Sequence, residues 1–182
     1  MAVIILATSL VVNMITVMNY LSYTILSETM RPMAKAAALA VQGNLHLLAD
    51  RLFLIRDDDV FVNKDESLDE KYRILARAAS GIEFVWFGLY SAYGRLETGT
   101  GQCPPFLDAF LPLRMQVTNN LVISDLTIGA GNELEIIIGT PVFSEGKIIN
   151  YLVGSYKYDI LNDVLGNLNT SLNSTAYIIN ER

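Results

Sequence analysis

The sequence predicts an α+β protein in which an N-terminal transmembrane helix continues into a long stalk helix, packed against a five-stranded antiparallel sheet. Three observations lead to this fold class. Residues 1–27 contain no charged side chain. A helical spacing of apolar residues then continues to about residue 56. After residue 83, β-branched and aromatic runs alternate with glycine-containing turns, which is typical of strands joined in hairpins.

Length, charge and residue counts limit the function classes. The 182 residues fit one compact domain with one added element. The net charge of -6, without a cluster of lysines or arginines, argues against nucleic acid as a partner. The single Cys103 excludes an internal disulfide, and the single His46 has no second histidine to join it in a metal site. We therefore expect no metal and no cofactor.

The uncharged residues 1–27 are long enough to cross a bilayer, for which about 20 apolar residues suffice. A cleavable signal peptide fits less well, because a basic start is missing. A pilin-like N-terminus is a second alternative, although Glu28 closes the apolar run instead of standing near its start. Arg31 and Lys35 follow the span, so a basic leader before Met1 is expected if the later residues are exported.

Polar residues within the span share one helix face. Ser9, Asn13, Thr16 and Tyr20 follow one another at spacings of four, three and four. Such residues in a membrane often contact a second helix. The sequence thus favours a helix-to-helix contact there, with a chance alignment of four tolerated polar residues as the alternative.

The stalk helix of residues 28–56 carries a heptad-like apolar seam. This seam suits either a partner helix or the surface of a sheet. Pro32 predicts a local irregularity, and three successive aspartates after Arg56 predict the end of the helix. We expect a homodimer through the stalk and transmembrane helices, and the alternative is a core helix with a membrane anchor. The seam consists of Val41, Leu45, Leu48, Leu52 and Ile55.

The rest of the chain predicts two helices and five strands. Ser67 and Glu70 form a capping-box pattern at the start of a helix that continues to Ala79. One sheet face is expected to pack on the stalk, and the other to lie under residues 99–118, where a small pocket would lie. The expected strands are 83–90, 95–98, 120–124, 133–143 and 147–157, with a further helix at 106–117.

Several short motifs occur in one order along the chain. They are Gly-Leu-Tyr-x-x-x-Gly at 88–94, Leu-Val-Ile-Ser-Asp at 121–125, Ile-Gly-Thr-Pro-Val at 138–142, Glu-Gly-Lys at 145–147 and Leu-Val-Gly-Ser-Tyr-Lys-Tyr-Asp at 152–159. Together they resemble the double Cache sensor domains of bacterial methyl-accepting chemotaxis receptors and of related sensor kinases and diguanylate cyclases. The resemblance implies a PAS-like extracytoplasmic module at 57–157. It also implies that 158–182 form a linking helix and the first strand of an incomplete second module, so that the chain is a fragment.

The resemblance also indicates ligand-binding positions. The amino-acid-sensing subgroup carries Arg-x-Trp-Tyr, and alignment on Trp86 puts Phe84 and Phe87 at the arginine and tyrosine positions. In the subgroup's Tyr-x-Asp motif, Ile123 replaces the tyrosine and Asp125 is kept, and a further acidic position falls near Tyr156. Phenylalanine cannot clamp a carboxylate, so a typical α-amino acid is not the expected ligand.

Each candidate has a structural alternative. Asp125 could hold an amine or hydroxyl, or could cap a turn. Trp86 could stack on an apolar or cationic group, or could be core together with Phe84. Arg114 is a candidate anion partner, or an exposed surface residue. The candidate ligand-binding residues are Trp86, Asp125, Phe84, Phe87, Arg114 and Tyr156.

No pattern for catalysis appears in the sequence. No nucleophile and base form a recognisable pair, and Cys103 before Pro104 reads as a packing residue. The sequence therefore predicts a non-enzymatic receptor module in the cell membrane, with its globular part extracytoplasmic and a small molecule as ligand. The alternatives are the sensor part of a kinase or cyclase, and a membrane-anchored structural or adhesion domain without a ligand.

Overall fold

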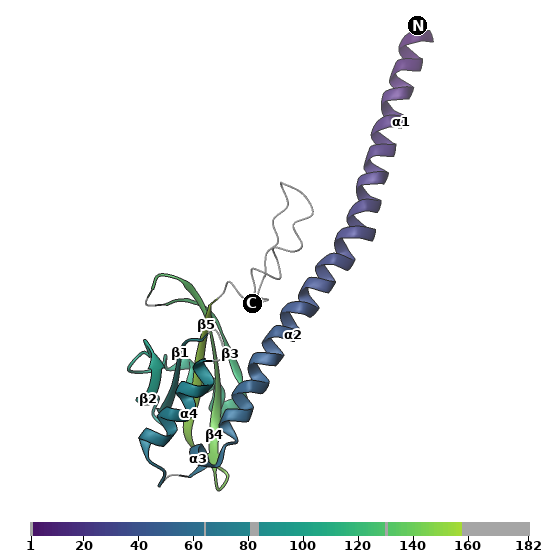
Figure 1. The fold of residues 1–182 in the computed structure, drawn as a ribbon. Helices are drawn as coiled ribbons and strands as arrows, with labels where there is room; N and C mark the ends of the chain where they lie inside the picture. Colours follow the sequence, from purple (N-terminus) through teal and green to yellow (C-terminus); the bar gives the residue numbers. More distant parts are fainter. Residues whose placement is uncertain (1, 64, 81–83, 130, 158–182) are drawn as a thin grey trace. The chain divides into compact units, whose positions relative to one another are not determined.

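The computed structural model describes residues 2–63, 65–80, 84–129 and 131–157 (Figure 1). The expected second module at 158–182 lies outside these residues. The chain divides into two compact units between Gln42 and Gly43, and each is described by itself.

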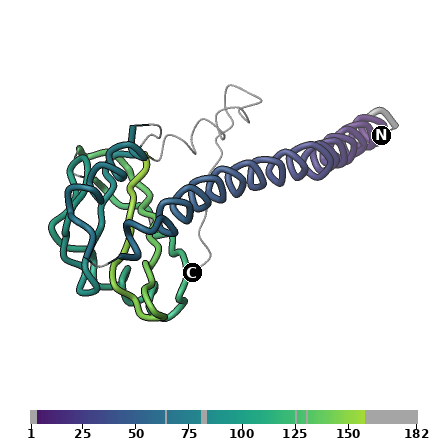
Figure 2. The backbone as a smooth tube through the Cα atoms, turned by 60° about the horizontal axis from the view of Figure 1, so that its bottom comes forward, coloured from purple at the N-terminus to yellow at the C-terminus, as the bar shows by residue number. Residues whose placement is uncertain are grey.

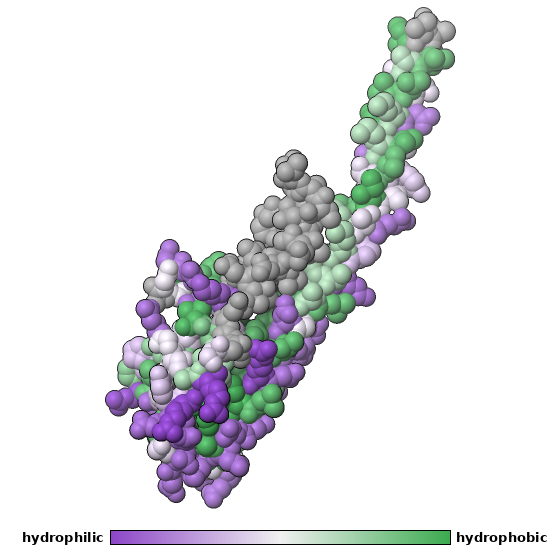
Figure 3. Space-filling view, in the orientation of Figure 1, coloured by the Kyte–Doolittle hydropathy of each residue, from purple (hydrophilic) through white to green (hydrophobic). Residues whose placement is uncertain are grey.

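The N-terminal helix α1 spans Ala2–Ile25, a π-helical turn spans Leu26–Met30, and α2 spans Arg31–Arg56. The π turn precedes Pro32, whose missing N–H and bulky ring disturb the hydrogen bonds of the preceding turn. The surface of α1 is mostly apolar (Figure 3), and the described residues contain one helix that is long and apolar enough to cross a membrane. The end of α2 at Arg56 confirms the predicted end of the stalk.

Three shorter helices follow. Asp58 caps α3, Asp59–Val62, by accepting a hydrogen bond from the Val60 N–H at 3.1 Å. The sequence reading missed α3 because it took the aspartates only as the end of the stalk. The Glu70 N–H donates to Ser67 Oγ (3.2 Å) at the start of α4, Leu68–Ser80, as the capping pattern predicts.

The last helix, α5, spans Phe110–Thr118 and begins later than expected. Phe106 forms an isolated antiparallel bridge with Arg95, which holds the preceding residues in an extended path. This bridge explains why the predicted helix at 106–117 loses its first residues.

The five strands form one antiparallel sheet in the order β2-β1-β5-β4-β3, which confirms the predicted α+β class and strand number. The long strands β4 and β5 lie side by side (Figure 2). β2 is longer than expected, because its glycines pair with β1 instead of ending the strand. The strand bounds are β1 Phe84–Ser91, β2 Leu96–Gly101, β3 Val122–Ile128, β4 Leu134–Ser144 and β5 Lys147–Lys157.

One face of the sheet, here called the helix face, packs against the end of α2 and against α3 and α4. Leu52, Phe61 and Leu75 contribute one fully buried side chain from each helix. Arg56 Nη1 donates to Thr140 Oγ1 on β4 at 3.4 Å. The lower part of the predicted apolar seam therefore packs on the sheet.

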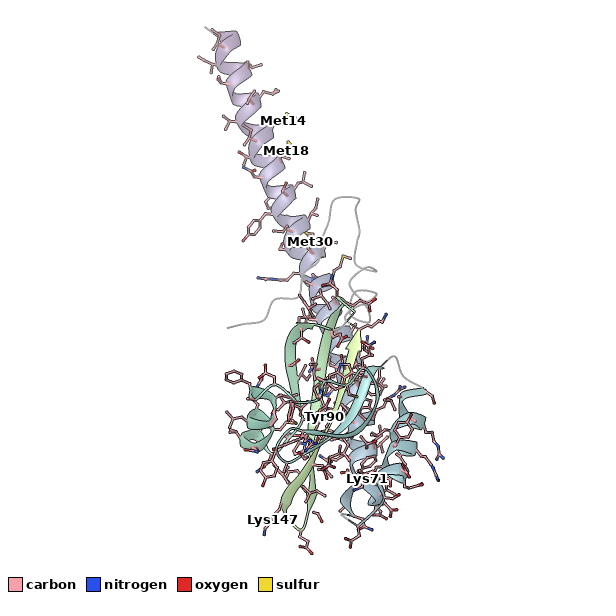
Figure 4. The ribbon with its side chains drawn as sticks, turned by 90° about the vertical axis from the view of Figure 1, so that its left-hand side faces the viewer. Met14, Met18, Met30, Lys71, Tyr90 and Lys147 are labelled. Carbon is pink, nitrogen blue, oxygen red and sulfur yellow. The ribbon has the colours of Figure 1, made fainter. Side chains whose placement is uncertain are left out.

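The opposite face, here called the α5 face, lies under α5 and the segment before it (Figure 4). Met115 packs against Gly139, and the Cys103 sulfur packs against Gly88 and Gly99. A Cβ at Gly99 would come within 2.6 Å of that sulfur, so the glycine makes the close approach possible. An apolar core thus fills the middle of this face.

Candidate functional site

Strand alternation divides the sequence-predicted residues between the two sheet faces. Trp86 pairs with Ser155, and Phe87 pairs with Gly154 in the next position. Successive side chains of a strand point to opposite faces. Trp86 therefore lies on the α5 face, and Phe87 on the helix face. One pocket cannot be lined by all the predicted residues.

Phe84 joins Phe87 on the helix face, because the register shifts between Phe84 and Trp86. The Phe84 ring stacks on Phe87 with centroids 4.5 Å apart and lies 4.3 Å from the Tyr156 ring. Both phenylalanine rings cover Gly154, whose missing side chain gives them room. These three aromatic residues form part of the layer beneath the helices.

Tyr156 is almost fully buried, and its hydroxyl has no hydrogen-bond partner among the described residues. Burial raises the pKa of this hydroxyl above its ordinary value, and the charge of Arg51 opposes the shift only in part. Its position under α2 is that of a packing residue. Whether Phe84, Phe87 or Tyr156 contacts a ligand stays a prediction.

On the α5 face, Trp86 belongs to a buried polar cluster that the sequence did not reveal. The Trp86 indole Nε1–H donates to Glu135 Oε2 at 3.3 Å. The Ser155 hydroxyl donates to the same oxygen at 2.5 Å. Glu135 is only 3% exposed and Ser155 is fully buried. We call Trp86, Glu135 and Ser155 the carboxylate cluster.

The carboxylate of Glu135 has unused acceptor capacity. A carboxylate can accept about four hydrogen bonds, and both described donors go to Oε2. Oε1 lies against Gly129, where an added Cβ would overlap it. Lys157, which faces Glu135 in the strand register, pairs with Glu133 at 2.8 Å. No described lysine or arginine forms an ion pair with Glu135.

The described donors to the buried Glu135 carboxylate, the Trp86 indole and the Ser155 hydroxyl, are both neutral. Burying a charge is costly unless it is paired and hydrogen-bonded. The cluster could therefore stabilise a positively charged or hydrogen-bond-donating group that approaches Oε1. The indole ring of Trp86 beside the carboxylate could contribute a cation–π contact.

Asp125 and Arg114 are the two remaining candidate residues. Asp125 belongs to β3 at a register shift between Ile123 and Leu126, and its side chain lies outside what the structure describes. Arg114 is on α5 with an exposed side chain. The structure does not bring Arg114 to the carboxylate cluster by any hydrogen bond or ion pair among the described residues.

Sequence reasoning missed Glu135 and Ser155, although a signal for Glu135 was present. Glu135, Ile137 and Gly139 are alternate residues of the predicted strand 133–143, so their side chains point to the same face. An acidic residue on the inward side of such a strand is unusual and needs a partner. Ser155 gave no comparable signal, since a small polar residue fits either face of a strand.

Next to the cluster, the α5 face is apolar with a few satisfied polar groups. Gln116 Nε2 donates to the Tyr151 hydroxyl at 2.8 Å, and the Tyr90 hydroxyl donates to the Pro104 carbonyl at 3.1 Å. Burial raises the pKa of the Cys103 thiol, partly offset by its hydrogen bond to the Phe87 carbonyl. A protonated, packed thiol is a poor nucleophile, so Cys103 is placed as a packing residue.

Solved structures share this fold, although the sequence itself has no match among family models and no significant match among curated proteins. The ligand-binding domain of the Campylobacter jejuni chemoreceptor Tlp3 with 4-methylisoleucine matches with a TM-score of 0.63 at 13% identity. The Pseudomonas aeruginosa domains of PctB with L-Arg and PctC with GABA match with TM-scores of 0.63 and 0.59 at 16% and 17% identity.

The chain has the fold of chemoreceptor ligand-binding domains. The matches cover 74% of this chain for Tlp3, 77% for PctB and 81% for PctC. This chain in turn spans 59%, 61% and 66% of those domains. At these identities, the likeness concerns the chemoreceptor-type fold and does not extend to the ligand.

Proposed function

We propose that this chain is the extracytoplasmic sensing part of a bacterial transmembrane receptor of the chemotaxis type, built on a double Cache module. The chemoreceptor-type fold and the apolar helix that leads into it support this proposal. The named neighbours are receptor domains and not enzymes. The proposed ligand site is the carboxylate cluster on the α5 face, with Asp125 as a further predicted contact.

The ligand class follows from the buried carboxylate of Glu135, which is the observation that carries this proposal. We propose a small cationic amine whose ammonium group approaches Oε1 and the Trp86 ring. L-Arg and GABA, the ligands in the PctB and PctC structures, both carry an ammonium group. No described arginine or lysine pairs with the cluster, so an α-carboxylate would have no bidentate partner there. A typical α-amino acid is thus not the proposed ligand.

Signal transfer is proposed to occur through small shifts of paired stalk helices. A ligand shifts such an equilibrium only by its difference in affinity for the two states. The part of the stalk seam within residues 43–56 packs on the sheet, so a second chain would meet the other side of α2. Leu47 and Leu54 are exposed there, one heptad apart, and are 54% and 77% exposed.

Thermal unfolding of the full chain in lipid nanodiscs tests the ligand proposal. The panel holds primary amines such as ethanolamine and putrescine, with GABA and L-valine for comparison. We expect an amine to raise the unfolding temperature of the wild type, because a ligand that binds only the folded state stabilises it. Glu135→Gln keeps a hydrogen-bond acceptor but removes the charge, and should abolish this shift.

The matched control is Glu145→Gln, in the exposed turn at the opposite end of β4. It should respond to the amine like the wild type. Asp125→Asn tests the remaining sequence-predicted contact. A shift that persists in Glu135→Gln would contradict the proposed site, and stabilisation by L-valine alone would contradict the ligand class.

A further inference from the structure

A hollow lies on the helix face, away from the carboxylate cluster. It has a volume of about 830 Å³ and lies between α4, the β1–β2 turn and the beginning of β5. This volume falls in the range of about 300–1,000 Å³ that is usual for small-molecule sites. The charged and amide side chains that line it are Glu66, Lys71, Arg95, Glu97 and Asn150.

Lys71 is the unusual residue of this hollow. It lies one helical turn before the fully buried Leu75 and is itself only 4% exposed. Lysines are almost never buried without a partner, and they normally extend the ammonium group into water. The Lys71 ammonium group forms no hydrogen bond and no ion pair with a described residue. A lysine with a largely buried side chain, whose ammonium group has no partner among the described residues, therefore lines the wall of an open hollow.

The carboxylates in the hollow do not neutralise Lys71. Glu97 Oε2 accepts a hydrogen bond from Asn150 Nδ2 at 2.8 Å, and Glu66 forms no ion pair with Lys71. Arg95 is exposed. The lining thus combines two basic groups, Lys71 and Arg95, with the acidic groups of Glu66 and Glu97, a balance that admits a monoanion more readily than a multiply charged anion.

Asn150 supplies a second recognition element. Its Nδ2 donates both to Glu97 and to the Tyr90 carbonyl, the latter at 3.1 Å. These bonds fix the amide orientation and leave Oδ1 without a donor among the described residues. A ligand with a hydroxyl or N–H group could donate to this oxygen.

We propose that this hollow binds a small monocarboxylate that also carries a hydrogen-bond donor, with Lys71 holding the carboxylate. The site is separate from the carboxylate cluster and takes the opposite charge. It does not depend on the receptor function proposed above. Figure 4 labels Lys71 on α4 and Lys147, which serves as the control residue, at the β4–β5 turn.

Calorimetric titration of the full chain in nanodiscs with sodium lactate tests the proposal, with acetate and inorganic phosphate at equal ionic strength for comparison. Lactate should bind more tightly than acetate, which lacks the hydroxyl, and phosphate should bind more weakly than lactate. Lys71→Met should lower lactate affinity by about tenfold or more, since it removes a charge-assisted hydrogen bond. Lys71→Arg should retain most of the affinity.

The controls separate this site from other effects of charge. Lys147→Met removes an exposed lysine and should leave lactate affinity unchanged, as should Glu135→Gln in the other site. A far-ultraviolet spectrum and an unfolding curve for each variant show that it is folded. The absence of lactate binding to the folded wild type, equal binding by Lys71→Met, or tighter binding of phosphate would overturn the proposal.

Discussion

Glycine 129 shows how one missing side chain sets the geometry of the carboxylate cluster. Its Cα lies so close to Glu135 Oε1 that an added Cβ would overlap the carboxylate. Gly131, two residues later, has open space around the same position. Neither glycine has a positive φ, so alanine is compatible with both backbones.

Alanine substitutions at Gly129 and Gly131 form a matched test of the position of the Glu135 carboxylate. Gly129→Ala should displace the Glu135 carboxylate and lower the free energy of unfolding by about 1–3 kcal/mol, as overpacking usually does. Gly131→Ala should change it by less than about 0.5 kcal/mol. Urea unfolding measures both. Equal effects of the two substitutions would show that Glu135 does not occupy the position described.

Tyr156 provides a test at alkaline pH. Burial raises the pKa of its hydroxyl above the ordinary 10.0, so the folded state keeps the proton where the unfolded chain releases it. The stability that this group contributes is therefore complete below about pH 10 and is lost as pH rises further.

Tyr156→Phe should weaken that loss of stability above about pH 10, by up to about 1.4 kcal/mol per pH unit. Near neutral pH, the variant should be as stable as the wild type or more stable, because it removes a buried hydroxyl without a partner. Urea unfolding between neutral pH and about pH 11 makes the comparison. Parallel stability curves for the two proteins would contradict the burial of this hydroxyl.

At the scale of elements, the C-terminal half of α2 has two different apolar sides. Leu52 is fully buried on the sheet, whereas Leu54 is 77% exposed two residues later. Residues two apart on a helix do not face the same way. The buried side stabilises the fold, and the exposed side is available for the proposed second chain.

Two substitutions separate these roles. Leu52→Ala should lower the free energy of unfolding by about 2–5 kcal/mol, because it leaves a cavity. Leu54→Ala should change stability by less than about 0.5 kcal/mol, yet should weaken self-association in sedimentation experiments. If Leu54→Ala leaves self-association of the wild-type chain intact, the proposed dimer contact is wrong.

At the scale of the whole molecule, periodicity predicted most of the fold. The uncharged N-terminal run, the stalk ending at Arg56 and the strand at 147–157 depend on local patterns, and the structure has them. Helix α3 depends on its cap at Asp58, and the late start of α5 depends on the bridge at Phe106. Both are single contacts, which a periodic pattern of residues does not reveal.

The candidate site was less predictable, because it depends on which face each strand residue occupies. A register shift after Phe84 turns it to the same face as Phe87, and no motif reveals that shift. The resemblance identified Trp86. Its partners Glu135 and Ser155 belong to other strands and lie 49 and 69 residues later in the sequence. Long-range pairing of this kind is fixed by the fold and not by sequence spacing.

Trp86 also provides the most direct measurement, because it is the one tryptophan in the chain and its indole N–H donates to Glu135. Its fluorescence should report on ligand binding at the cluster without a label. Titration of the nanodisc-embedded chain with the amine that stabilises it should shift the emission in a saturable way. The shift should persist in Glu145→Gln and disappear in Glu135→Gln. An amine that binds by calorimetry but leaves Trp86 emission unchanged, or shifts it equally in Glu135→Gln, would contradict the carboxylate cluster as the ligand site.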